Sequence, residues 1–272
     1  MAAPTLPPAQ PVPGRLTMLL RQAPYWATVY KRTWRGSAIS SFLMPLLYVA
    51  AMGILLGGYV DRSSANLEGA PSYLAFVVPG LLAAHAMQTA TGEVTYPVMG
   101  AVKWNRTYYG MIATPLRVSD VVAAHLVFVL FRVATSCGVF LVVVSLFGVL
   151  DSVWGAVLAF LVQVLVGVAF AAPIYAYSAG LTSDAGFAVV YRLMIMPLFL
   201  FSGAFFPISN LGPALQWLAR LTPLWHGVDL TRMLTLGHVD WPLAGIHVLY
   251  LAALGALGWW WAVRRLGRRL VD

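Results

Sequence analysis

The sequence predicts an all-α integral membrane protein with six transmembrane helices. Six long apolar runs carry almost no charge, and roughly 20 apolar residues suffice for a helix to cross a hydrocarbon core of about 30 Å. Hydrophobic residues make up 60% of the chain and charged residues only 10%. The mean hydropathy of +0.80 is far above that of soluble proteins. Helices satisfy their own backbone hydrogen bonds, so they suit lipid.

The six spans are expected in order along the chain, within a single membrane domain at 15–268. They are predicted at about 39–60, 73–98, 119–149, 153–180, 186–206 and 243–263. Of the 17 basic residues, five precede the first span, three lie between the second and third spans, and four follow the sixth. Because such residues concentrate on the cytoplasmic side, both termini are expected there. The net charge of +8 therefore indicates membrane orientation, and no nucleic-acid partner is expected.

The segments before the first span have their own composition. Residues 1–14 contain five prolines and no charge, which favours a disordered lead-in. Residues 15–35 combine apolar side chains with five basic ones, which predicts an amphipathic helix in the membrane interface. A solvated basic leader is the alternative. The first apolar run is too long for a signal peptide, so it is expected to stay uncleaved.

Two other stretches depart from the simple pattern. The region between the fifth and sixth spans is interrupted by Pro207, Pro213 and Pro223, yet it is too apolar for a solvated loop. Short helices that dip into the outer leaflet or pack against protein are expected there. Residues 269–272 form the end of a basic tail. Cys137 is the only cysteine, so neither an intrachain disulfide nor a cysteine-based metal site is expected.

The loop between the second and third spans is the richest candidate for a docking surface. It is cytoplasmic in the predicted topology, long enough for a short helix, and expected to end that helix at Pro115. Aromatic residues, Arg and Asn are typical of interface hot spots. The candidate residues are Lys103, Trp104, Asn105, Arg106, Thr107, Tyr108, Tyr109, Thr114 and Pro115. A simple interfacial anchor is the alternative, because Trp and Tyr favour that depth.

Ionisable residues inside the spans are the second kind of candidate. Glu93, Arg132 and Arg192 fall in spans, and such groups are costly in lipid unless they face a partner, water or the bundle interior. Arg132 is expected to line a path or to form a structural ion pair. Glu93 and Arg192 could instead reach the cytoplasmic interface.

The fifth span supplies an apolar candidate surface for cargo. Its aromatic and methionine side chains suit an adaptable binding surface, although ordinary packing or lipid contact remains open. The path candidates on this span are Met196, Phe199, Phe201, Phe205 and Phe206.

Signatures of enzymes do not occur in the sequence. There is no G-x-x-x-x-G-K-[ST] motif, so this chain has no P-loop, and ATP would have to be bound by another polypeptide. The H-E-x-x-H and G-x-S-x-G motifs are equally missing. We expect no enzyme activity, metal site or bound cofactor in this chain.

The order of these features resembles the ABC-2 type permeases. The resemblance rests on Thr114-Pro115-Leu116, on Ser202-Gly203-x-Phe205-Phe206-Pro207, and on Leu221-Thr222-Pro223-Leu224-Trp225-His226. Residues 197–203 and 103–108 are most similar to the lipooligosaccharide (nodulation-factor) exporter branch. The resemblance covers residues 15–268.

This resemblance implies a half-transporter in the bacterial cytoplasmic (inner) membrane. Two permease chains, identical or paralogous, would each dock a cytoplasmic ATPase that binds ATP and Mg. Residues 101–117 would include the coupling helix, and residues 15–35 would form a connecting helix. Spans one and five would line the dimer interface and the outward route, capped by the short helices. The cargo would be apolar or amphipathic: a lipid, a glycolipid or a drug-like molecule.

Two alternatives remain open. A secondary transporter would need paired or chained carboxylates at mid-membrane, whereas Glu93 is the only acid well inside a span. A membrane-embedded enzyme would need acids, histidines or a nucleophile clustered at one face. The sequence therefore favours the permease of an ATP-driven exporter.

Overall fold

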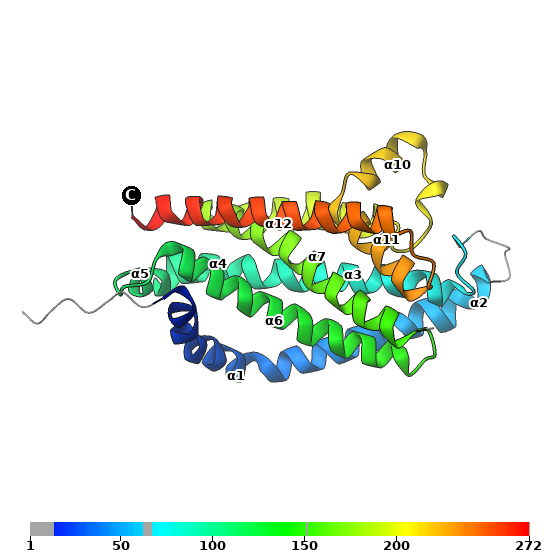
Figure 1. Ribbon diagram of the computed structural model, residues 1–272, viewed down its shortest axis with the longest axis horizontal. Helices are drawn as coiled ribbons and strands as arrows, with labels where there is room; N and C mark the ends of the chain where they lie inside the picture. Colours follow the sequence, from blue (N-terminus) through cyan, green and yellow to red (C-terminus); the bar gives the residue numbers. More distant parts are fainter. Residues whose placement is uncertain (1–13, 62–66, 151, 272) are drawn as a thin grey trace, which may run out of the picture.

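A computed structural model describes residues 14–61, 67–150 and 152–271 of the chain. The lead-in predicted at 1–14 lies outside this part except for Gly14. The described residues form helices and no strand, and the long helices run side by side as one elongated bundle (Figure 1). In order, they are α1 Arg15–Tyr48, η1 Val49–Leu56, α2 Gly57–Val60, α3 Tyr73–Val94, α4 Tyr96–Met99, η2 Gly100–Trp104, α5 Thr107–Ile112, α6 Val118–Ser145, α7 Val153–Gly180, α8 Ala185–Val189, η3 Val190–Ile195, α9 Met196–Phe201, η4 Ile208–Asn210, α10 Pro213–Arg220, α11 Pro223–Thr235 and α12 Trp241–Leu270.

Within the described ranges, five helical stretches are long and apolar enough to cross a membrane. They are Arg15–Val60, Tyr73–Trp104, Val118–Ser145, Val153–Gly180 and Trp241–Leu270. Val153–Gly180 coincides with the predicted fourth span. Tyr73–Trp104 and Trp241–Leu270 run beyond the predicted second and sixth spans, and α12 includes the first residues of the predicted tail. Val118–Ser145, the predicted third span, ends at Ser145 instead of 149.

The predicted fifth span, 186–206, is wrong at its C-terminal end. The helical stretch Ala185–Phe201 ends five residues early and is 17 residues long. A turn replaces the expected helix because Gly203 adopts a φ of +81°, which suits glycine far better than any other residue. This stretch is at the lower limit of about 17 residues for a span, so six spans are not confirmed.

The interfacial helix predicted at 15–35 is not separate from the first span. A continuous helical stretch runs from Arg15 to Val60, and its first turns lie at an angle to the remainder (Figure 1). The ring of Trp26 stacks on Phe128 of α6 with centroids 4.7 Å apart. Leu16 and Leu20 remain exposed, at 70% and 62%. The apolar residues of this stretch are therefore divided between protein contact and the surface.

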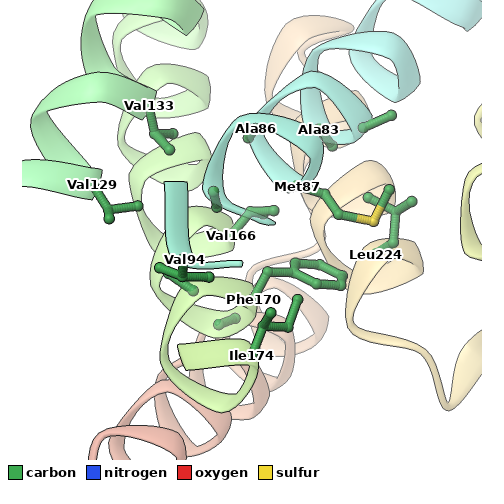
Figure 2. Close-up of a cluster of buried hydrophobic side chains, with 14 of the residues drawn as sticks. Ala83, Ala86, Met87, Val94, Val129, Val133, Val166, Phe170, Ile174 and Leu224 are labelled. Carbon is green, nitrogen blue, oxygen red and sulfur yellow. The ribbon is translucent and has the colours of Figure 1, made fainter. Parts of the chain in front are cut away.

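The core of the bundle forms around α7. This helix packs against α12, α3, α6 and α11. Figure 2 shows the centre of the resulting cluster. Its labelled members are Ala83, Ala86, Met87, Val94, Val129, Val133, Val166, Phe170, Ile174 and Leu224. Small side chains among them let the helices approach closely, as in other membrane bundles.

The turn after α9 is held directly against α3. A Cβ atom added to Gly80 would lie 2.5 Å from the Cα atom of Ala204 and 2.7 Å from its carbonyl oxygen. Both contacts involve backbone, which cannot rotate away as a side chain does. The absence of a side chain at Gly80 therefore allows α3 to contact the turn at residues 202–207.

We expect Gly80→Ala to lower the stability of the folded chain by about 1–3 kcal/mol, the usual cost of overpacking. Gly92→Ala is the matched control in the same helix, because an added Cβ there meets nothing within 4 Å. Thermal unfolding of both variants in detergent measures the difference. Equal midpoints for the two would contradict the close approach at Gly80.

Candidate functional site

The bundle has two ends with different content (Figure 1). One, here named the α5 end, carries α5, the first described turns of α1 and the C-terminus. The other, the α10 end, carries α2, α10 and α11. The predicted docking residues lie at the α5 end, and the short helices before the last span lie at the α10 end.

The surface at the α5 end consists of only part of the predicted docking set. Trp104 is 56% exposed, and Lys103, Asn105, Arg106, Tyr109, Thr114 and Pro115 are also exposed, while Thr107 is half-buried. Arg106 precedes α5 with a left-handed φ of +49°. Helix α5 ends at Ile112, with Ala113 as its C-cap, two residues before Pro115.

Tyr108 is not part of this surface, contrary to the sequence-based interpretation. It is fully buried, and its hydroxyl lies 2.5 Å from Nδ1 of His125 in α6. The other ring nitrogen, Nε2, lies 3.0 Å from the carbonyl oxygen of Glu93. A carbonyl only accepts, so Nε2 carries the hydrogen and Nδ1 accepts from Tyr108. This chain of hydrogen bonds anchors α5 to α6 and α3.

Two exposed members of the predicted docking set, Lys103 and Tyr109, form hydrogen bonds within the chain. The Lys103 ammonium donates to the carbonyl of Thr182 at 3.1 Å, and the Tyr109 hydroxyl donates to the carbonyl of Arg269 at 3.2 Å. These contacts join α5 and η2 to the α7–α8 turn and to the end of α12. Trp104 and Arg106 remain as the large exposed side chains beside α5.

Two of the three ionisable residues predicted inside the spans, Glu93 and Arg132, form an ion pair. Nε of Arg132 lies 2.8 Å from Oε1 of Glu93, and their side chains are 14% and 22% exposed. The Arg132 guanidinium also lies 5.8 Å from the centroid of the Tyr30 ring. Each charge thus has a partner, which lowers its cost in a membrane. Arg192, by contrast, is exposed.

A second buried cation, Arg232, was missed by sequence reasoning. It donates to Oε2 of Glu68 at 3.0 Å and to the carbonyl of Gly203 at 2.7 Å. Its guanidinium lies 3.9 Å from the centroid of the Phe76 ring. Burial raises the pKa of Glu68, and the positive charge of Arg232 opposes that rise. This network fixes the turn after α9 at the α10 end.

Two histidines at the α10 end form another network that the sequence did not indicate. The Nδ1 atoms of His226 and His247 lie 2.6 Å apart, so one of them carries a hydrogen and the other accepts it. Nε2 of His247 lies 3.0 Å from Oδ2 of Asp229, and the Tyr250 ring stacks on His226. Across the described residues, no group of three His, Cys, Asp or Glu side chains is placed to hold a metal ion.

The apolar path candidates do not gather in one place. Met196 and Phe201 are 60% and 43% exposed, whereas Phe199 packs edge-to-face on Phe205 with centroids 4.9 Å apart. Phe206 is half-buried. Phe201 lines a cavity of about 230 Å³.

A larger cavity lies between α7, the stretch from α8 to α9, and the helices α10 to α12. Its volume is about 620 Å³, within the roughly 300–1,000 Å³ of small-molecule sites. None of the five apolar path candidates lines it, and neither do the other two path candidates, Glu93 and Arg132. Phe170, Ile174, Met194, Leu198 and Tyr250 are among the residues that do.

The chain matches a transporter family and several known bacterial proteins. The ABC-2 type transporter family matches residues 25–236. Nodulation protein J of Rhizobium leguminosarum bv. trifolii is 34% identical over 221 residues, which cover 78% of this chain and 82% of that protein. Nodulation protein J of Rhizobium meliloti is 30% identical over 256 residues, or 90% and 94% of the two chains.

A relative of lower identity comes from Escherichia coli. The inner membrane transport permease YadH of Escherichia coli K12 is 25% identical over 233 residues, which cover 85% of this chain and 88% of that protein. The predicted resemblance to ABC-2 type permeases is thereby confirmed. The chain belongs to the ABC-2 type transporter family.

Proposed function

We propose that this chain is the transmembrane permease subunit of an ATP-driven exporter that works with a separate ATPase. The observation that carries the proposal is the α5 end, where Trp104 and Arg106 are exposed beside a helix anchored in the bundle. The chain contains no P-loop motif, so ATP and Mg would be bound by the partner. Two permease chains and two ATPase subunits would form the complex.

The anchor of α5 supports its assignment as the coupling helix. One face of α5 is exposed, and the opposite face is held through Tyr108 to His125 and the Glu93 carbonyl. A force applied to the exposed face therefore reaches α6 and α3 through direct contacts. ATP binding must favour one arrangement of the bundle over another for transport to follow.

The orientation follows from the basic residues. Lys103, Arg106 and Arg117 flank α5 in the sequence, and four arginines lie in the last turns of α12. Helix α5 and the C-terminus lie at the same end of the bundle (Figure 1). Basic residues concentrate on the cytoplasmic side of a membrane. We therefore place the α5 end, with both termini and the ATPase, in the bacterial cytoplasm.

An apolar or amphipathic cargo suits the cavity of about 620 Å³. The three hydroxyls that line this cavity donate within the chain: Tyr250 to the Leu221 carbonyl at 2.6 Å, Tyr177 to the Gly186 carbonyl at 3.3 Å and Thr222 to the Ala219 carbonyl at 2.6 Å. Polar cargo groups would lose hydrogen bonds to water there without replacement. A lipid, glycolipid or drug-like molecule fits this environment.

A secondary transporter driven by an ion gradient is the alternative. It would need a membrane carboxylate that binds and releases the coupling ion. Glu93 already has a partner within the chain, since Arg132 lies 2.8 Å from it. The pairing weighs against Glu93 as a coupling group.

The joint substitution of Trp104 and Arg106 by Ala tests docking. Hot-spot residues each contribute about 2 kcal/mol or more, about 30-fold in affinity, so co-purification of the cognate ATPase should be lost. Trp217→Ala with Arg220→Ala is the matched control, because both side chains are exposed on α10 at the other end. If both double variants bind the ATPase as the wild type does, α5 is not the docking site.

Tyr108→Phe separates anchoring from docking. The change leaves His125 Nδ1 buried without its donor, which costs about 1–3 kcal/mol, while the exposed residues stay in place. We expect a lower thermal midpoint with unchanged ATPase binding in a pull-down. A loss of binding at full thermal stability would place Tyr108 in the docking surface instead.

Glu93→Gln tests the ion pair against ion-coupled transport. It leaves Arg132 without its counter-charge, so stability should fall by less than the about 3–5 kcal/mol of fully buried pairs. The double variant with Arg132→Gln should recover part of that loss in thermal unfolding. Full stability of Glu93→Gln, together with complete loss of transport that the double variant does not restore, would favour the secondary transporter.

A further inference from the structure

The turn between α7 and α8, residues 181–184, is held by side chains from two distant parts of the sequence. Nη1 of Arg269 donates to the carbonyl of Ala179 at 2.9 Å and also to the carbonyl of Leu181. Nζ of Lys103 donates to the carbonyl of Thr182 at 3.1 Å. Three neighbouring carbonyls thus accept from two cations.

Helix chemistry explains why cations gather at this turn. The last carbonyls of α7 have no partner within the helix, and a positive charge at a helix C-terminus is favourable. A second arginine also lies there, since a Cβ atom on Gly180 would be 2.7 Å from Nη2 of Arg265. Among the described residues, neither Lys103 nor Arg269 forms an ion pair with a carboxylate.

The same side chains connect the turn to α5. Lys103 belongs to η2, immediately before α5. Tyr109 of α5 donates to the carbonyl of Arg269 at 3.2 Å, and Arg269 in turn holds the turn. We name this set of contacts, made by Lys103, Tyr109 and Arg269, the turn clasp.

Much of the stretch that follows the turn is exposed, with Phe187, Val190 and Ile195 as its buried residues. From α8 to α9, Leu193 and Met196 are 74% and 60% exposed. Few buried contacts make a segment the easiest to displace. The clasped turn is where this stretch joins the more firmly packed α7.

We propose that the turn clasp makes the α7–α8 turn move together with α5, so that ATPase-driven displacement of α5 is passed to the stretch from α8 to α9. Lys103 and Arg269 are positioning residues in this step. The inference rests on the proposed function and deepens it, because it names a second route besides the Tyr108 anchor. It also assigns Lys103 and Tyr109 to contacts within the chain.

Distances between spin labels test whether the two elements move as one. The purified permease–ATPase complex would carry labels at Gly110→Cys and Ala185→Cys in a Cys137→Ser background, which removes the only native cysteine. A second labelled variant, with Gly110→Cys and Val157→Cys on α7, reports the movement of α5 relative to the bundle. On trapping with Mg-ATP and vanadate, the 110–157 distance should change and the 110–185 distance should not. A changed 110–185 distance in the wild type overturns the proposal.

The joint substitution of Lys103 and Arg269 by Gln tests the clasp itself. In this variant the 110–185 distance should change on trapping, and the fraction of complex in the trapped arrangement should fall by about 5-fold or more, as for a typical coupling between sites. ATPase co-purification should persist, because Trp104 and Arg106 are unchanged. A constant 110–185 distance in the variant overturns the proposal.

Two controls make the result specific. Arg268→Gln removes the same charge from an exposed neighbour and should behave as the wild type, while Arg269→Lys keeps a cationic donor and should restore much of the coupled movement. If Arg268→Gln has the same effect as the double variant, a loss of positive charge explains the result and the clasp is overturned. If the wild-type chain binds no ATPase, the proposed function fails as well; if it binds and the clasp variant stays coupled, only this inference fails.

Discussion

Helix α7 lies at the centre of the bundle, and close packing against it is the constraint that α3, α6, α11 and α12 share. Small residues permit this packing: an added Cβ at Gly258 of α12 would lie 2.6 Å from the Pro173 nitrogen, and one at Gly167 would lie 3.1 Å from Val133. In a membrane, association between helices depends on such close contact, because lipid already solvates apolar side chains. The positions of the ion pairs, the cavity and α5 all follow from this arrangement.

Polar contacts perform a second task, which is to hold the irregular segments that connect the long helices. Arg232 fixes the turn after α9 through the Gly203 carbonyl, and Tyr108 fixes α5 through His125. Arg269 and Lys103 fix the turn after α7. Arg232 and Arg269 donate to backbone carbonyls at turns, whereas Tyr108 donates to a side chain of another helix.

Packing and polar contacts together divide the chain into a firm body and a looser stretch. The body is built from α3, α6, α7, α11 and α12, whereas the stretch from α8 to α9 exposes much of its apolar surface. A transporter needs an element that changes position while the rest stays folded. In the proposed complex, the exposed residues beside α5 and the turn clasp would connect that element to the ATPase at one end of the molecule.

Hydropathy by itself determined the class of the protein and most of its helices. The span at 153–180 has the predicted bounds, because a long apolar run specifies a helix locally. Tertiary structure alone decided which of two adjacent tyrosines is buried, since Tyr108 and Tyr109 have the same propensity and differ only in the side of α5 they occupy. It also decided that Glu93 meets Arg132 and that Arg269 meets the α7–α8 turn. Such pairings depend on how whole helices are rotated and placed against one another, which no local pattern of residues fixes.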